Sequence, residues 1–162
     1  MAPPRERPCE LLAGIGLEVE EVWSGDARRV EFLILAEHVE EIHGKLYLMG
    51  GAWETIHVAR FDVPVTLSVA VSVQVPWNAT NQQHAVSVSV QTADGKVLTA
   101  EERQIMVGRP AHVEPGTSQR TLLVLAVSVD LPKPDGYVVV AAIDEIPQAR
   151  VSFSAVPGHA HA

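Results

Sequence analysis

The alternation of apolar and polar residues is the dominant pattern in the sequence. From residue 63 to residue 75 every odd position carries Val or Leu, whereas the even positions carry Pro, Thr, Ser, Ala and Gln. Successive side chains of a β-strand point to opposite faces of a sheet, so a period of two over this length predicts a strand. This strand should have one face in the core and one small, polar face.

Shorter stretches repeat the pattern on both sides of this strand. Residues 30–37 and 46–49 predict a hairpin with a longer loop between them, ended by two glycines at 50 and 51. Residues 84–91 alternate again and lead through the tight turn Ala-Asp-Gly-Lys at 93–96 into a return strand over 97–107. That return strand carries Glu-Glu-Arg at 101–103, which is typical of a sheet edge protected from pairing with other chains.

Two later segments are apolar on both faces, and we expect both to be central strands. They cover residues 121–129 and 137–143, and a last strand is expected over 151–154. Tyr137 follows Gly136 and resembles a tyrosine corner. About eight short strands without helical segments between them predict an all-β fold, a two-sheet immunoglobulin-like sandwich.

The two ends of the chain differ from this pattern. Residues 1–29 form an N-terminal arm, in which an apolar stripe at helical spacing predicts a short helix; the stripe consists of Leu12, Ile15, Val19 and Trp23. We expect the arm to dock on the domain's own sheet, on a second copy or on a partner. The β-sandwich domain is assigned to residues 30–156, and residues 157–162 are expected to be a flexible tail.

Composition and charge narrow the range of functions. Hydrophobic residues make up 47% of the chain and aromatic residues only 5%, so the core should be aliphatic. A net charge of −8 argues against nucleic-acid binding, which needs a basic surface. Cys9 is the only cysteine, which excludes an intramolecular disulfide and a cysteine-based metal site. We see no secretion signal and no stretch long enough to cross a bilayer, so we expect a cytoplasmic protein without a membrane partner.

The sequence shows no constellation of catalytic or metal-binding residues. His38 and His43 lie among glutamates, but their spacing fits no zinc motif, so an acidic hairpin tip is the simpler interpretation. Nucleophile-elbow and phosphate-loop motifs are missing. One catalytic possibility stays open, a carboxylate pair formed in space by two of Glu31, Glu37, Glu101 and Glu102. We therefore predict no catalytic residue, no metal ligand and no cofactor.

The loop after residue 75 is the best candidate for a binding feature. An exposed Trp beside amides and an imidazole can stack on a ligand and form hydrogen bonds with it. The predicted interaction residues are Trp53, Trp77, Asn78, Asn81 and His84. In the alternative interpretation, Trp77 covers the open end of the sandwich and Asn81 stabilises the turn.

Several segments together resemble an uncharacterised bacterial family that is known only as a domain of unknown function. The resemblance covers residues 29–155 and is carried, in order, by 30–37, 44–53, Val75-Pro76-Trp77-Asn78, His84, Ala93-Asp94-Gly95 and Gly136-Tyr137. It implies a small β-sandwich and no established activity, catalytic residue or cofactor.

Two functional hypotheses follow from these observations. The first is a non-catalytic protein-binding or assembly module that acts through an unknown protein partner or through self-association. The second is a small-ligand-binding or hydrolytic sandwich with a site at one end, near Trp77 and His84. A deep pocket holding His84 with a carboxylate would favour the second hypothesis, and a flat apolar patch would favour the first.

Overall fold

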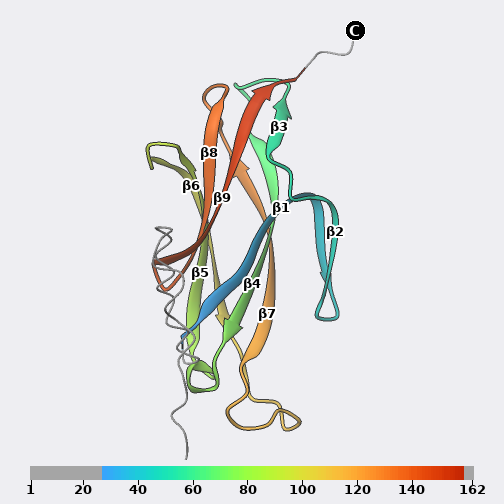
Figure 1. The fold of residues 1–162 in the computed structure, drawn as a ribbon, viewed down its shortest axis with the longest axis vertical. Coiled ribbons are helices and arrows are strands. Elements are labelled where there is room, and N and C mark those ends of the chain that lie inside the picture. The colour runs from blue at the N-terminus through green and yellow to red at the C-terminus, as the bar shows by residue number, and fades with distance from the viewer. Residues whose placement is uncertain (1–26, 159–162) are drawn as a thin grey trace, which may run out of the picture.

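The computed structural model describes residues 27–158, which form a two-sheet β-sandwich (Figure 1). This confirms the predicted all-β sandwich. Residues 1–26 and 159–162 are outside the described part, so the predicted helix and docking of the arm, and most of the predicted tail, stay predictions.

Within residues 27–158 the chain forms nine strands and one turn of 3-10 helix. They are β1 (Arg29–Ile42), β2 (Lys45–Gly51), β3 (Thr55–Val58), β4 (Val65–Val75), η1 (Trp77–Ala79), β5 (Gln83–Thr92), β6 (Val97–Met106), β7 (Gln119–Val129), β8 (Asp135–Ile143) and β9 (Ile146–Pro157). One sheet has the order β2-β1-β4-β7, and the other has the order β3-β9-β8-β5-β6. All neighbours are antiparallel except β3 and β9, which run parallel.

The core between the sheets is aliphatic, as the composition predicts. The odd positions of β4 from Val69 to Val75 are fully buried, and the alternating valines of β5 are buried as well. Val63 departs from the expected pattern, since it precedes β4 and is 47% exposed. The period-two pattern therefore extends beyond the strand that it predicts.

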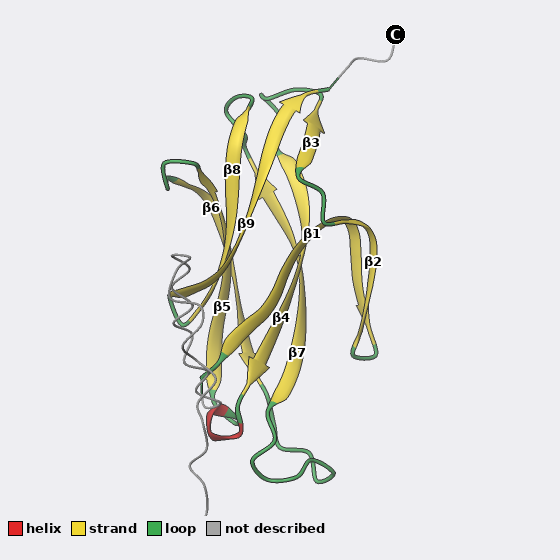
Figure 2. Ribbon diagram, in the orientation of Figure 1, coloured by secondary structure: helices red, strands yellow, loops and turns green. Residues whose placement is uncertain are grey.

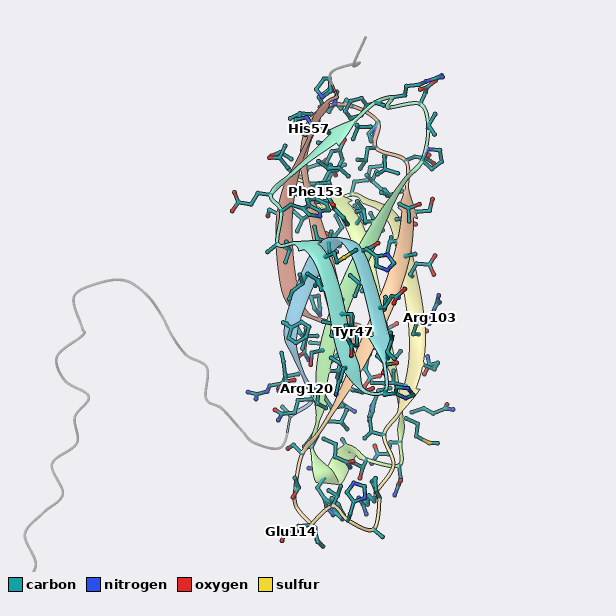
Figure 3. The ribbon with its side chains drawn as sticks, turned by 90° about the vertical axis from the view of Figure 1, so that its right-hand side faces the viewer. Tyr47, His57, Arg103, Glu114, Arg120 and Phe153 are labelled. Carbon is teal, nitrogen blue, oxygen red and sulfur yellow. The ribbon has the colours of Figure 1, made fainter. Side chains whose placement is uncertain are left out.

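The β1–β2 hairpin covers part of the outer face of the first sheet. Its predicted longer loop is wrong, because β1 continues to Ile42 and only His43 and Gly44 form the turn. Their φ angles of 53° and 73° fit a two-residue primed turn. In Figure 3 the hairpin lies in front of the sheet, with Tyr47 on its surface. Beneath it is a second apolar cluster, in which Ala36, Val39 and Ala70 are buried and Phe32, Ile34, Leu46 and Leu48 are partly buried.

The sheet edges confirm one prediction and overturn another. β6 is an edge strand, as its charges predict, and β8 is central. β7 is not central, because it lies at the edge of its sheet next to β4 alone. The outer face of β7 is apolar but exposed at Val124 and Ala126, so apolar residues on both faces do not by themselves identify a central strand.

Candidate functional site

The predicted interaction residues do not form one site, because Trp53 and Trp77 lie far apart in the sandwich. Trp77 is part of η1, the short red helix at the lower end of Figure 2, whereas Trp53 precedes β3, which lies in the upper half of the figure. Trp53 packs edge-on against Phe153, with 5.7 Å between ring centroids. Trp53 is thus partly buried and packs against the core, away from Trp77 and His84.

Trp77 is held in place by a basic residue from the loop after β6. The guanidinium of Arg109 lies 4.5 Å from the centroid of the Trp77 ring. Its Nη2 donates to the Trp77 carbonyl at 2.8 Å, and its Nε donates to the hydroxyl of Thr80. One face of the half-buried indole is therefore already occupied, so the interpretation that Trp77 covers the end of the sandwich fits this geometry.

The two asparagines of this loop are exposed and differ in role. The backbone N–H of Asn81 donates to the Val107 carbonyl at 2.8 Å. The φ angle of Asn81 is 58°, in the left-handed region that Asn tolerates better than most residues. The carbonyl of Asn78 accepts a hydrogen bond from Gln82 at 3.1 Å. Asn81 thus stabilises the turn through its backbone, and both side chains face solvent.

His84 is buried at the start of β5, with 2% of its surface exposed. Its Nε2 lies 2.8 Å from the carbonyl of Ala79 and must donate, because a carbonyl only accepts. Its Nδ1 lies 3.0 Å from Arg28 Nη1 and 3.1 Å from Asp144 Oδ2. Both ring nitrogens are engaged within the protein, so the imidazole connects the η1 loop to the β8–β9 turn.

Asp144 anchors the other side of this cluster. Its Oδ1 accepts the Ala85 amide at 2.9 Å, and its Oδ2 lies 3.1 Å from Arg28. Burial raises the pKa of the Asp144 carboxyl, but the Ala85 amide, His84 and Arg28 together lower it further, so the net shift is downward. The fold therefore stabilises the ionised form of Asp144.

This shift predicts a pH dependence of stability. A carboxyl whose pKa is lower in the folded state stabilises the fold above its unfolded pKa of about 4, and this contribution is lost as pH falls through the lower folded value. Asp144→Asn should reduce the free energy of unfolding at neutral pH, and the difference from wild type should shrink below about pH 4. Urea unfolding across this pH range measures both effects.

Glu145→Gln is the matched control, since it removes a carboxylate from an exposed position in the same turn. If Asp144→Asn and Glu145→Gln gave the same pH profile, the network around His84 would not stabilise the fold through the charge of Asp144.

A shallow, open cleft of about 320 Å³ lies beside this cluster but does not include His84. It is lined by Ala27, Arg28, Asn78, Ala79, Gln82, Ile143, Ile146 and Gln148. Gln148 bonds to Arg28 and to Val30 of the same chain, at 3.1 Å each. Within residues 27–158, this end of the sandwich therefore shows no deep pocket with an accessible histidine and carboxylate. Such a pocket would have favoured a ligand-binding or hydrolytic site.

The remaining candidate residues for catalysis or metal binding lie on different strands of the two sheets. Glu31 bonds to Ser72 and Arg120 on the first sheet, whereas Glu101 pairs with Arg103 on β6 of the second. His38 pairs with Glu40 at 3.1 Å on the β1–β2 hairpin. Across residues 27–158, no group of three potential metal ligands is gathered. Over the same residues, no helix has the length and apolar character that crossing a membrane requires.

The most unusual surface is the free edge of β7. From Thr121 to Val129 this strand has no charged residue, no proline and no glycine. It pairs with β4 from Val65↔Val129 to Val75↔Gln119, and within the described chain no strand lies on its other side. Val124 and Ala126 are exposed on its outer face. The sequence predicts this strand, but its apolar residues on both faces favour a central position rather than an edge.

The opposite sheet has an edge of a different kind. β6 pairs with β5 so that Glu101 and Arg103 lie opposite Val88 and Val86, which places these charges on the inner face. Inward-pointing charges are a common device that prevents an edge strand from accepting another strand. β6 and β7 face each other across the sandwich, so one edge on this side is protected and the other is open.

The comparison with known proteins identifies a family and adds no activity. No curated protein matches the chain. Residues 31–156 match the model of a family of unknown function, DUF6941. Since the match covers most of the chain, this protein belongs to that family.

Proposed function

We propose that this protein is a non-catalytic protein-binding or assembly module, and that the free edge of β7 is its contact surface. The observation that carries the proposal is the uncharged edge from Thr121 to Val129, next to β4 only. An edge strand presents a row of backbone donors and acceptors, and natural proteins usually protect it with charges, prolines or bulges. β6 has such protection and β7 has none, which supports a functional use of the β7 edge.

A strand that adds to β7 would gain main-chain hydrogen bonds and side-chain contacts on both faces. Val124 is 36% exposed on the outer face, close to the apolar cluster under the β1–β2 hairpin. These contacts supply affinity without a deep pocket.

The ligand-binding or hydrolytic alternative has less support. His84 would need a free nitrogen that a substrate can reach, yet it is buried and both nitrogens have partners. The cleft beside it is open and shallow.

The proposal predicts that a charge on β7 weakens assembly. In Val124→Lys, an ammonium would lie among apolar side chains at the contact, so binding should weaken by about 1.4–2 kcal/mol, roughly 10- to 30-fold. The measurement is the size of the assembly that the tagged full-length chain forms in extract of its native source, by native gel and size exclusion. Val97→Lys is the matched control, because Val97 is an exposed valine on the other edge strand, β6.

We expect the wild type and Val97→Lys to migrate in the same assembly and Val124→Lys to migrate as a monomer. If the Val124→Lys assembly were unchanged, the β7 edge would not be the contact surface.

We also propose that the sandwich is immunoglobulin-like. The Tyr137 hydroxyl donates to the Lys133 carbonyl at 2.6 Å, four residues earlier in the chain. A tyrosine that bonds back to the upstream backbone in this way is a feature of tyrosine corners.

A further inference from the structure

We infer that the strand that adds to β7 is β7 of a second copy, in an antiparallel, two-fold arrangement. This inference rests on the proposed use of the β7 edge and specifies its partner. Most homodimers have such a two-fold axis, and the same surface on both copies must then complement itself. The charges at the two ends of β7 meet this requirement.

The beginning of β7 carries an exposed guanidinium. Arg120 donates to Glu31 at 3.0 Å through Nη2, and its side chain is 61% exposed. Arg29 also lies close enough to help lower the pKa of Glu31, after the larger effect of Arg120. Glu31 engages Nε and Nη2 of Arg120, so Nη1 of this exposed guanidinium can donate to a second carboxylate.

The end of β7 is negatively charged. Asp130 directly follows the strand, is exposed, and has no ion-pair partner within residues 27–158. The residues between Arg120 and Asp130 carry no charge. An antiparallel copy therefore places the exposed guanidinium of Arg120 against the carboxylate of the partner's Asp130, whereas an in-register parallel copy places two Asp130 carboxylates together.

The charges also select one register. In a two-fold antiparallel pair, one residue lies opposite its own copy, and side chains directly opposite each other point to the same face. Only with Leu125 at the centre does Arg120 face Asp130. Val124 then faces Ala126, and the small Ala126 side chain leaves room for Val124. The two four-stranded sheets would become one continuous sheet with no free β7 edge.

Cysteine cross-linking tests this register on the full-length chain. All variants carry Cys9→Ser, because Cys9 is the only native cysteine. Opposite side chains in an antiparallel pair have Cβ atoms about 4.5–5.5 Å apart, close to the separation a disulfide needs. Oxidation should link the double variant Val124→Cys/Ala126→Cys into a covalent dimer in high yield. Each single variant should stay unlinked, because in this register position 124 faces position 126 and not itself.

Sedimentation of the purified chain tests the partner. We expect a dimer for the wild type and Val97→Lys, and a dissociation constant raised about tenfold or more for Val124→Lys. A dimer in which a single cysteine variant cross-links would overturn the register.

The remaining outcomes separate the two proposals. A purified chain that is monomeric, while its assembly in native extract still depends on Val124, would overturn the second copy and leave the proposed function standing. A monomer whose β7 amides exchange faster after Leu12→Lys would assign the edge to the chain's own arm and would overturn the inference too. A dimer unaffected by Val124→Lys would overturn both proposals.

Discussion

Val69→Asp is expected to unfold the domain, or to lower its free energy of unfolding by roughly 3–5 kcal/mol, because it leaves an unpaired charge in the core. Val69 is fully buried on β4, within the aliphatic cluster between the two sheets. The surrounding side chains offer no hydrogen bond to a carboxylate. Urea unfolding of the purified variant measures the loss.

Three further variants make the result interpretable. Thr66→Asp introduces the same charge at an exposed position of β4 and should change stability by less than about 0.5 kcal/mol. Val69→Ala should still fold, with a loss of about 2 kcal/mol from the missing methyl groups and the cavity. Ala70→Asp should be as damaging as Val69→Asp, because the β1–β2 hairpin covers Ala70 completely. Equal stability of Ala70→Asp and Thr66→Asp would contradict that packing of the hairpin.

His84→Ala is expected to lower the free energy of unfolding by roughly 2–4 kcal/mol, since it leaves a cavity and an unpaired carbonyl at Ala79. The same change also separates the η1 loop from the pair formed by Arg28 and Asp144. The matched control is His57→Ala, which removes an exposed imidazole on β3 (Figure 3) and should cost less than about 0.5 kcal/mol.

The two histidine variants also distinguish the two functional hypotheses. If His84→Ala were as stable as wild type, the imidazole would not have a structural role. The ligand-binding or hydrolytic alternative would then become the stronger one.

Much of the fold could be predicted from the alternation of apolar and polar residues along the chain. Alternation gave the core face of β4, and the charges at 101–103 correctly predicted β6 as an edge. This alternation assigns the side chains of a strand to its two faces, but it does not show which other segments cover each face. The small residues Ala70 and Ser72 were therefore expected at the surface, whereas both are buried.

The candidate site was harder to predict, because it depends on strand order. Trp53 and Trp77 have the same side chain, but one packs on Phe153 in the core and the other under Arg109 at the far end. For β7, a lack of charge fits both a central strand and an unprotected edge. Only the pairing of β7 with β4 alone separates these two interpretations. The residues of the site were visible in the sequence, but their neighbours were not.

The parallel pairing of β3 with β9 constrains how the protein folds during synthesis. It joins residues 55–58 to residues 154–157, so the second sheet cannot close before the ribosome has made almost all of the domain. Pairing between segments so distant in sequence is intrinsically slow, because the entropy of closing a long loop is lost before the contacts form. Until then β3 lacks its only neighbour in the sheet, and β8 lacks its neighbour on one side. An incomplete sandwich exposes apolar surface and unpaired strand edges, which favour aggregation of the nascent chain.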